Sequence, residues 1–352
     1  MKRFAALGLL MLLSASLAGT AAVGRAATAT HTHPRKSLSV LLYVSGSLGD
    51  LGFFDSAHAG VERAAKDLGA TVKVVQNPDT TQWKTQVLAL AGSHKYDLII
   101  FDASTWDSDA ATVIKRYPHQ RFINFDDNTF ATSPNVSSII YKQNEGSFLA
   151  GALAAMVADD SKLPYVSHKR VLGMVGGMNI QVINDFKVGY VQGAHTVDPR
   201  MVVRVTYIGG SGSNDTWNNK PAGARLAASL YDQGAAVVYQ VAGGSGLGVL
   251  DEAKIKNRYA IGVDSNQDNF APGHVIGSVV KRVDNSLFDL IKLDMQGKLK
   301  GAHVYYYGLQ NHGVALTRDA ETRAIIPASM YDRLDALAAA VAKGKIKVQS
   351  TF

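Results

Sequence analysis

The sequence predicts an α/β protein built from two similar halves. Three observations carry this prediction: 352 residues exceed what one compact core usually holds, short apolar runs alternate with longer amphipathic ones, and one order of segments occurs twice. Because roughly 320 residues remain after an N-terminal targeting segment, we expect two lobes with a ligand crevice between them.

The N-terminus has the pattern of an export signal. Lys2 and Arg3 precede an apolar run from Phe4 to Leu17, and small residues follow. The run is too short for a membrane-spanning helix, and its flanks are those of a cleavable signal. We expect residues 1–26 to be a signal peptide and residues 27–37 to be a flexible leader.

Cysteine content and charge exclude several classes of site. The chain has no cysteine, which excludes disulfides, thiolate metal sites and the lipid-attachment cysteine of a bacterial lipoprotein. The sequence therefore predicts a protein free in the periplasm. Loss of Lys2, Arg3 and Arg25 with the signal leaves 33 Lys and Arg against 29 Asp and Glu, a net charge of +4 instead of +7. No basic cluster is present, so no nucleic-acid partner is expected.

The predicted strands are short runs rich in Val, Ile and Leu. Such near-continuous apolar runs are typical of parallel strands that are covered on both faces. The expected strands are Leu38–Val44, Thr71–Val75, Asp97–Phe101, Phe122–Phe125, Val136–Tyr141, Val171–Val175, Val202–Tyr207, Ala236–Val241, Tyr259–Val263, Val275–Val280 and Val304–Tyr307.

The predicted helices lie between these strands. In each of them apolar residues recur at three- and four-residue spacing, the period of one helical face. The expected helices are Ser56–Leu68, Thr80–Ala91, Glu145–Ala158, Val182–Val197, Ala222–Gln233, Asp284–Gln296 and Met330–Lys343.

The repeated order of segments divides the chain into two lobes. A helix containing Gly60 leads to the apolar run 69–75, as a helix containing Gly189 leads to the run 200–205. The run 95–100 then has its counterpart in 234–239. We expect lobe 1 to hold residues 38–143 plus 276–310, and lobe 2 to hold 144–275 plus 311–352. Three crossings would form the hinge between them, near Tyr141–Asn144, Asn269–Val275 and Gly308–Val314.

A Gly/Asp turn with two aromatic residues follows the first strand and precedes a helix, where crevices of open α/β sheets lie. This turn, Gly49–Ala57, resembles the segment Gly-Asp-x-Ser-Phe-Asn-Asp-Ser-Ala of the basic membrane protein (PnrA-like) family of ABC-transporter substrate-binding proteins, from which it departs at Gly52 and Phe54. Further segments resemble the family in order: Pro134–Val136, Glu145–Gly151, Val175–Met178, Leu230–Ala235, Ala242–Gly248, Ile261–Gln267 and Val280–Asp284.

The resemblance implies the type I periplasmic binding protein fold, with two Rossmann-like α/β/α lobes and a three-crossing hinge. It also implies a purine nucleoside as the ligand, held by aromatic stacking and by carboxylates on the ribose. The implied partners are this ligand and an ABC-transporter permease in the inner membrane; no cofactor and no metal site is expected. The same fold serves receptors for a riboflavin-like ligand or a sugar, and receptors that feed a chemosensor, so these alternatives stay open.

The resemblance places the stacking rings and the polar ligand contacts. Phe53 falls on the family's stacking phenylalanine, and Phe186 is the opposing candidate, although a helical Phe is usually a core residue. Asp264 falls on the ribose-binding aspartate, and the alternative is that it caps the next turn. Asp126 falls on another family aspartate, and capping or turn formation explains it almost as well. Lys281 matches a ligand-site position, but a solvated charge beside Arg282 is the alternative.

The remaining candidates lie at predicted strand ends. Asp50 belongs to the Gly/Asp turn, and Ser45 stands where the family commonly carries an aspartate, so one ring-reading carboxylate is missing. Trp106 and Trp217 follow strands of different halves and either stack on a ligand or anchor their loops. The pair Gly243 and Gly244 lacks the lysine of a phosphate-binding loop and suits close approach of backbone to an uncharged ligand.

Two other functional classes are disfavoured. An enzyme needs a reacting group, and the chain has no Gly-x-Ser-x-Gly elbow, no HExxH motif and no clustered histidines. A transcriptional regulator of this fold would need a DNA-binding module where the export signal lies. We therefore expect a non-enzymatic receptor.

Overall fold

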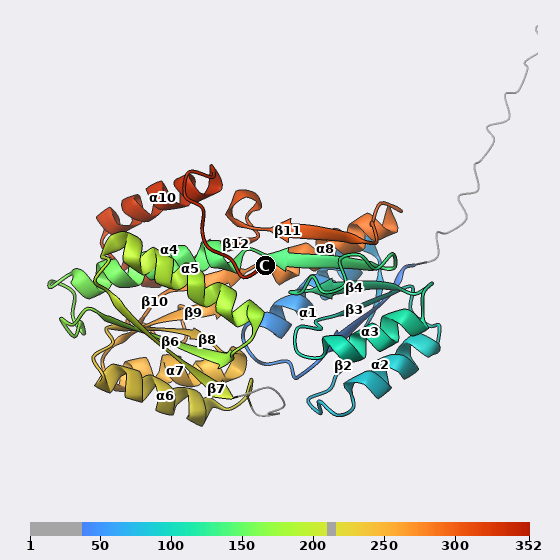
Figure 1. The fold of residues 1–352 in the computed structure, drawn as a ribbon, viewed down its shortest axis with the longest axis horizontal. Helices are drawn as coiled ribbons and strands as arrows, with labels where there is room; N and C mark the ends of the chain where they lie inside the picture. The colour runs from blue at the N-terminus through green and yellow to red at the C-terminus, as the bar shows by residue number, and fades with distance from the viewer. Residues whose placement is uncertain (1–36, 210–215) are drawn as a thin grey trace, which may run out of the picture. The chain divides into compact units, whose positions relative to one another are not determined.

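Two six-stranded sheets organise the computed structural model, which describes residues 37–209 and 216–352 (Figure 1). The expected signal peptide and all of the expected leader except Ser37 lie outside the described residues. We call the sheet that begins with the first strand, together with its helices, lobe 1, and the other sheet with its helices lobe 2. No helix in the described part of the chain combines the length and apolar character that crossing a membrane requires.

Lobe 1 is a parallel sheet covered by two helices on each face. Its strands run in the order β11 (His303–Tyr307), β5 (Val136–Tyr141), β4 (Arg121–Phe125), β3 (Leu98–Phe101), β1 (Ser39–Val44) and β2 (Thr71–Gln76). The helices α1 (Phe53–Leu68) and α8 (Val283–Met295) pack on one face, and α2 (Trp83–Gly92) and α3 (Asp107–Arg116) on the other.

Lobe 2 repeats this plan with one antiparallel strand. Its order is β12 (Val314–Leu316), β10 (Val275–Lys281), β9 (Tyr259–Asp264), β8 (Val237–Val241), β6 (Val171–Met178) and β7 (Val202–Gly209), and only the β10–β12 pair is antiparallel. Helices α4 (Gln143–Asp159), α5 (Gln181–Val197) and α10 (Ala328–Ala342) cover one face, and α6 (Lys220–Asp232) and α7 (Gly243–Ile255) the other. The short helices are α9 (Ala320–Arg323) and η1 (Leu309–Asn311).

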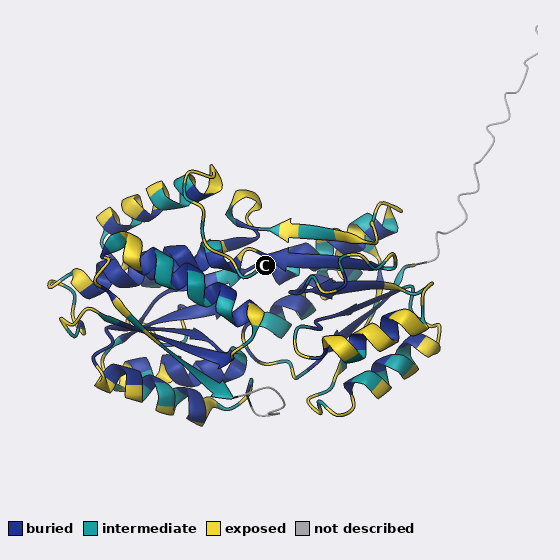
Figure 2. Cartoon of the chain, in the orientation of Figure 1, coloured by how far each residue is buried: buried dark blue, intermediate teal, exposed yellow. Residues whose placement is uncertain are grey.

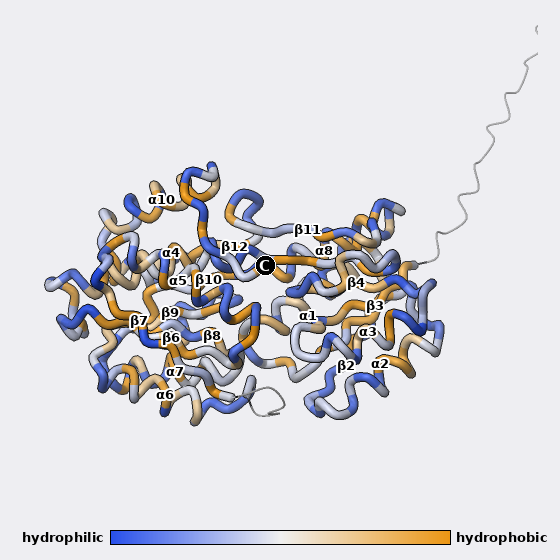
Figure 3. The backbone as a smooth tube through the Cα atoms, viewed as in Figure 1, coloured by the Kyte–Doolittle hydropathy of each residue, from blue (hydrophilic) through white to orange (hydrophobic). Residues whose placement is uncertain are grey.

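The apolar runs form the interior of both lobes. All residues of β3, β5, β8 and β9 are buried, whereas the helices expose their outer faces (Figure 2). The hydropathy along the backbone follows this division, with apolar residues concentrated in the strands (Figure 3). Burial on both faces explains why these strands are continuous apolar runs and not alternating ones.

One expected boundary between the lobes is wrong. Residues 276–281 were expected in lobe 1, but β10 pairs with β9 and β12 in the sheet of lobe 2. The segment 269–275, expected as a crossing, is a turn with Gly273 at φ +84° that leads into the neighbouring strand of the same sheet. The second crossing is therefore at Arg282, between β10 and α8.

Candidate functional site

The two sheets direct the ends of β4, β9 and β10 toward one place. Asp264 ends β9, Lys281 ends β10, and Asp126 follows β4 of the other lobe. All three side chains are buried, and Lys281 is only 1% exposed. Carboxyl ends of parallel strands share one edge of a sheet, which is where ligands bind in open α/β folds.

Lys281 forms an ion pair across the two lobes. Its Nζ lies 2.6 Å from Asp126 Oδ2 and 3.9 Å from Asp264 Oδ1. A cation is costly to bury unless it is paired and hydrogen-bonded, and both conditions are met here. The alternative of a solvated Lys281 is excluded by this burial.

Aromatic rings from both lobes surround the same ammonium group. The Lys281 Nζ lies 4.6 Å from the ring centroid of Phe53, 5.1 Å from that of Phe186 and 5.3 Å from that of Tyr141. Phe53 is the first residue of α1 in lobe 1, and Phe186 lies on α5 in lobe 2. The structure thus brings together the two rings that were predicted from opposite lobes, at distances suited to cation–π contact.

The two aspartates have unusual backbone and open hydrogen-bonding capacity. Asp126 has φ +69° and Asp264 has φ +64°, the left-handed region that costs non-glycine residues free energy. One oxygen of each carboxylate, Oδ1, is buried with no hydrogen-bond partner among the described residues. Buried acceptors are nearly always satisfied, so an unpartnered pair at one place suits hydroxyl or amine donors of a ligand.

Burial dominates the acid–base behaviour of these carboxyls. Loss of solvent raises the pKa of Asp264 to about 7, although the nearby Lys281 acts to lower it. Burial likewise raises the pKa of Asp126 against the lowering influence of Lys281. Asp102, at the end of β3, also has its pKa raised to about 7 by burial and by the charge of Asp126.

Asp102 and Tyr141 belong to this site and were missed in the sequence. Asp102 directly follows β3, which pairs with β4 and so lies beside the strand that presents Asp126. A carboxylate just after a predicted strand was the available signal. Tyr141 ends β5, and nothing in the sequence distinguishes it from a core tyrosine.

The carboxylate of Asp50 accepts hydrogen bonds from the backbone amides of its own turn. Oδ1 accepts from the amides of Gly52, at 3.0 Å, and Asp55, at 3.2 Å, and Oδ2 accepts from Phe54 at 3.0 Å. These amides lie at the start of α1, where a carboxylate satisfies otherwise unpaired N–H groups. Asp50 therefore fixes the turn that carries Phe53.

The ring of Phe54 packs against the turn that follows β1. Ser45 is buried directly after β1, and a Cβ on the adjacent Gly46 would lie 2.9 Å from the ring of Phe54. The Phe54 ring also contacts Phe53, with the ring centroids 5.2 Å apart. Phe54, one of the two residues at which the chain departs from the family segment, therefore covers the turn after Ser45.

Trp106 lies in the core of lobe 1. Its Nε1 donates to the carbonyl oxygen of Asp102 at 2.6 Å, and its ring is packed edge-on against Trp83 at 6.1 Å. The indole is 7% exposed within the cluster of Leu41, Tyr43 and Phe101. These contacts fit the anchoring alternative, because Trp106 holds the loop that carries Asp102.

Trp217 lies at the strand ends of lobe 2. Its half-buried ring covers Gly177 at the end of β6, and its carbonyl oxygen accepts from the amide of Ser245 at 3.1 Å. Gly243, with φ +54°, and Gly244 begin α7 beside it. A Cβ on Gly244 would lie 3.8 Å from Asp50 Cα, so the glycine pair lies where the two lobes meet.

Replacement of Gly177 by alanine tests the position of the Trp217 ring. A Cβ at this position would collide with the six-membered ring, so the indole must move toward solvent. We expect Gly177→Ala to lower the free energy of unfolding by about 1–3 kcal/mol, measured by urea denaturation. In a Trp217→Ala background the same substitution should cost far less. Equal costs in both backgrounds would contradict this placement.

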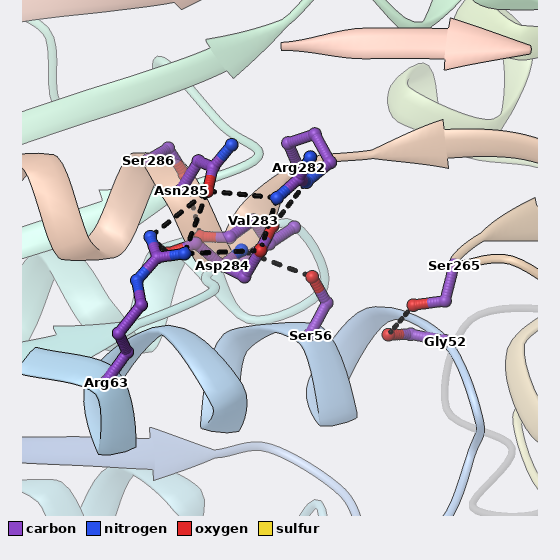
Figure 4. A network of polar contacts seen from close by, with 9 residues as sticks. All are labelled: Gly52, Ser56, Arg63, Ser265, Arg282, Val283, Asp284, Asn285 and Ser286. Atoms are coloured by element: carbon purple, nitrogen blue, oxygen red, sulfur yellow. Dashed lines mark hydrogen bonds and ion pairs between the residues drawn. The ribbon is translucent and has the colours of Figure 1, made fainter. Parts of the chain in front are cut away.

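Two hydrogen bonds join the lobes beside the ion pair. Ser265 Oγ donates to the carbonyl oxygen of Gly52 at 3.2 Å (Figure 4). Gln267 Nε2 donates to that of Leu51 at 3.1 Å. Both acceptors belong to the turn that carries Phe53. The loop after Asp264 and the turn before α1 therefore hold each other in the contact between the lobes.

An open cavity of about 810 Å³ lies beside these bonds. Lobe 1 contributes Leu51 and Ser56, and lobe 2 contributes Asp264 and Phe270. At the second crossing, Arg282 donates two hydrogen bonds of 2.8 Å to Asp284, and both residues line the cavity (Figure 4). The cavity is larger than a small metabolite, and Asp264 connects it to the buried ion pair.

Comparison with known proteins identifies the family. The sequence model of the family described as ABC transporter substrate-binding protein PnrA-like matches residues 37–350. The chain belongs to this family. It is thus the substrate-binding component of an ABC transporter, and the family implies a small-molecule ligand and a transporter permease as partners.

Individual relatives and solved structures agree with this assignment. The ABC transporter nucleoside-binding protein BmpA of Lactococcus lactis is 28% identical over 87% of this chain and 87% of its own length. A solute-binding protein of an ABC transporter system from Aeropyrum pernix has a TM-score of 0.79 and 26% identity, covering 88% of this chain and 92% of that one. Another, from Conexibacter woesei, has a TM-score of 0.68 and 22% identity, covering 90% and 100%. The type I periplasmic binding protein fold is confirmed.

The predicted localisation is wrong. An uncharacterized lipoprotein of Pyrococcus abyssi is 31% identical over 82% of this chain and 70% of its own length, and one of Pyrococcus horikoshii is 30% identical over 89% and 77%. These relatives named as lipoproteins contradict a protein free in the periplasm. The absence of cysteine excludes one anchoring chemistry, and it does not by itself place a protein in a compartment.

Proposed function

We propose that this substrate-binding protein takes a purine nucleoside between its lobes. The observation that carries the proposal is the arrangement around Lys281: a phenylalanine ring from each lobe and two aspartates, each with one oxygen that accepts no hydrogen bond from the described residues. A nucleoside offers both matching chemistries, a flat ring and a set of hydroxyl donors.

The aromatic side of the site suits a base. Phe53 and Phe186 come from different lobes, so closure brings their rings to opposite sides of one space. Stacking of a base on an aromatic side chain contributes about 1–3 kcal/mol. Trp217 and the backbone of Gly243 and Gly244 would border the ring from lobe 2.

The polar side of the site suits ribose. Asp126 and Asp264 present acceptors, and a hydroxyl that donates to a carboxylate forms a short, charge-assisted bond. The Lys281 ammonium would hold both carboxylates in place and donate to a ribose oxygen. The relative BmpA of Lactococcus lactis is named as a nucleoside-binding protein, which supports this assignment.

The charge balance disfavours phosphorylated ligands. Asp102, Asp126 and Asp264 are all buried at the strand ends, and Lys281 pairs with Asp126 and Asp264. A phosphate would meet carboxylates of the same sign in a site of low dielectric, which is unfavourable. The proposed cargo is therefore the nucleoside and not the nucleotide.

A thermal-shift panel tests the proposal. Adenosine, guanosine and inosine are compared with their 5′-monophosphates, with ribose and with riboflavin. A ligand at about a hundred times its Kd adds about 2.7 kcal/mol of stability, so a purine nucleoside should raise the Tm by several degrees and its monophosphate should not. Equal shifts from nucleoside and monophosphate would contradict the charge argument, and a shift from riboflavin alone would replace the ligand.

The ligand-free protein should lose stability as the pH rises from about 4 to about 7. Burial raises the pKa of Asp102 and of Asp264 to about 7, from an ordinary value of 3.8. In this interval the folded state keeps protons that the unfolded state has released, so a higher pH favours unfolding. Thermal unfolding from pH 4 to 8 measures the effect. In the double variant Asp102→Asn/Asp264→Asn this part of the slope should disappear; an unchanged slope would refute the attribution.

A further inference from the structure

Residues 346–352 form a strap that lies along α5 and ends near the first crossing between the lobes (Figure 1). Gln192 holds the strap from both sides of its amide: Nε2 donates to Lys347 O at 3.0 Å, and Oε1 accepts from Gln349 N at 2.7 Å. Thr351 Oγ1 donates to Gln181 O at 2.9 Å. Ile346, Val348 and Phe352 pack against the core of lobe 2. The strap is therefore fixed along most of its length.

Asp185 is the point where the strap meets the hinge. Its Oδ1 accepts from Ser350 Oγ at 2.7 Å and from the Thr351 amide at 2.8 Å. Its Oδ2 accepts from the amide of Asn144 at 3.3 Å, in the first turn of α4. Thr351 Oγ1 is a fourth, longer donor to Oδ1, at 3.4 Å. Asp185 is fully buried, so its carboxylate depends on these four donors.

The first turn of α4 has no cap of its own. The residue before the helix is Lys142, whose side chain makes no capping hydrogen bond. The first amides of a helix need acceptors, and a carboxylate is the most favourable one there. Asp185 supplies it from α5. The strap adds a second tie, because Asn144 Nδ2 donates to Gln349 O at 2.9 Å.

This junction is part of the hinge and adjoins the ligand site. The Lys142 amide donates to Tyr307 O at 2.7 Å, and Glu145 Oε2 accepts from the Leu309 amide at 2.8 Å, so the first and third crossings are bonded together. Phe186, the residue after Asp185, is the ring of lobe 2 that faces Lys281.

Close packing of α4 against α5 fixes the position of one helix relative to the other. A Cβ on Gly189 would collide with the carbonyl oxygen of Asn144, and one on Gly193 with that of Phe148. The backbones of α4 and α5 are thus in direct contact, and α5 has no room to shift along α4. Asp185 therefore lies where α5, which carries Phe186, is in fixed contact with the first turn of α4.

We propose that the strap and Asp185 form a brace that couples the first crossing to the position of Phe186, with Asp185 as a positioning residue for ligand binding. This proposal depends on the proposed function in one respect, namely that the ligand ring on which Phe186 stacks is the base of a nucleoside. It assigns a role in holding the ligand to a segment more than 150 residues away from Phe186 in sequence.

The test compares Asp185→Asn with Asp198→Asn. Asp198 directly follows the last residue of α5, where it accepts from Arg170 Nε at 2.8 Å and from the Arg200 amide at 2.9 Å. The two variants therefore each remove a buried carboxylate, one near the start of α5 and one at its end. An asparagine at 185 would turn its NH₂ group toward either Asn144 N–H or the strap donors. We expect about tenfold faster hydrogen exchange in the first turn of α4, and about tenfold faster nucleoside release, in Asp185→Asn alone.

Each outcome decides the proposal. If the amides in the first turn of α4 exchange at the wild-type rate in Asp185→Asn, or if both variants accelerate the exchange equally, the proposed brace is refuted. Faster exchange with unchanged nucleoside release would overturn its role in binding. If the wild-type protein binds no purine nucleoside, the proposed function fails, and the exchange measurement on the ligand-free protein still tests the brace. Should Asp185→Asn fail to fold, Ser350→Ala, which removes one of the four donors to Asp185, should show the same changes at smaller size.

Discussion

Replacement of Lys281 by methionine is expected to lower the free energy of unfolding by about 3–5 kcal/mol at pH 8. Methionine has nearly the same length, so the loss comes from charge and not from a cavity. In the wild type the Lys281 Nζ lies 2.6 Å from Asp126 Oδ2 and 3.9 Å from Asp264 Oδ1. The substitution would leave both carboxylates buried without this cation. Breaking a buried pair from one side is costly because the remaining charge keeps its desolvation penalty.

The pH dependence separates this cause from a general packing defect. Protonation neutralises the two carboxyls, so the deficit of Lys281→Met relative to the wild type should shrink as the pH falls to about 5. Urea denaturation at pH 5 and pH 8 measures both values. Lys256→Met is the matched control, because Lys256 pairs with Asp232 on the surface, where ion pairs contribute little. A deficit equal at both pH values would contradict a loss of charge compensation.

Asp264→Asn should weaken nucleoside binding by about 10- to 100-fold, since a hydrogen bond to a charged group contributes about 1.5–3 kcal/mol. Asparagine keeps the shape of the side chain and tolerates the left-handed backbone at φ +64°, whereas alanine would add strain. Calorimetric titration with the best-binding purine nucleoside gives the ratio of dissociation constants.

The same variant should not be less stable without ligand. Burial raises the pKa of Asp264 to about 7, which means that ionising this carboxyl is less favourable in the folded protein than in the unfolded chain. Removing that charge should leave the Tm of the ligand-free protein equal or raise it. Weaker binding together with a large drop in Tm would indicate structural damage instead of a lost ligand contact.

The fold was predictable because its signals are local. The continuous apolar runs predicted strands buried on both faces, and the strand ends predicted where Asp126 and Asp264 would lie. The boundary at residue 276 was not predictable in this way. Which sheet accepts β10 depends on its pairing with β9 and β12, and β12 lies more than 30 residues further along the chain.

The burial and the hydrogen-bond partners of the site residues could not be predicted from the sequence. Lys281 stands beside Arg282, and two adjacent cations look solvated, yet one is buried and the other holds Asp284. Asp50 looked like a ligand contact, but its oxygens accept from backbone amides. Both outcomes depend on neighbours brought together by folding, which no local pattern records.

Calorimetric titration of the wild-type protein with adenosine, guanosine and inosine is the decisive experiment for the proposed ligand. We expect saturable binding of at least one of them with one ligand per chain, and no binding of the corresponding 5′-monophosphate under the same conditions. Absence of heat from all three nucleosides, with tight binding of a sugar or of riboflavin, would contradict the proposed ligand while the family assignment stands.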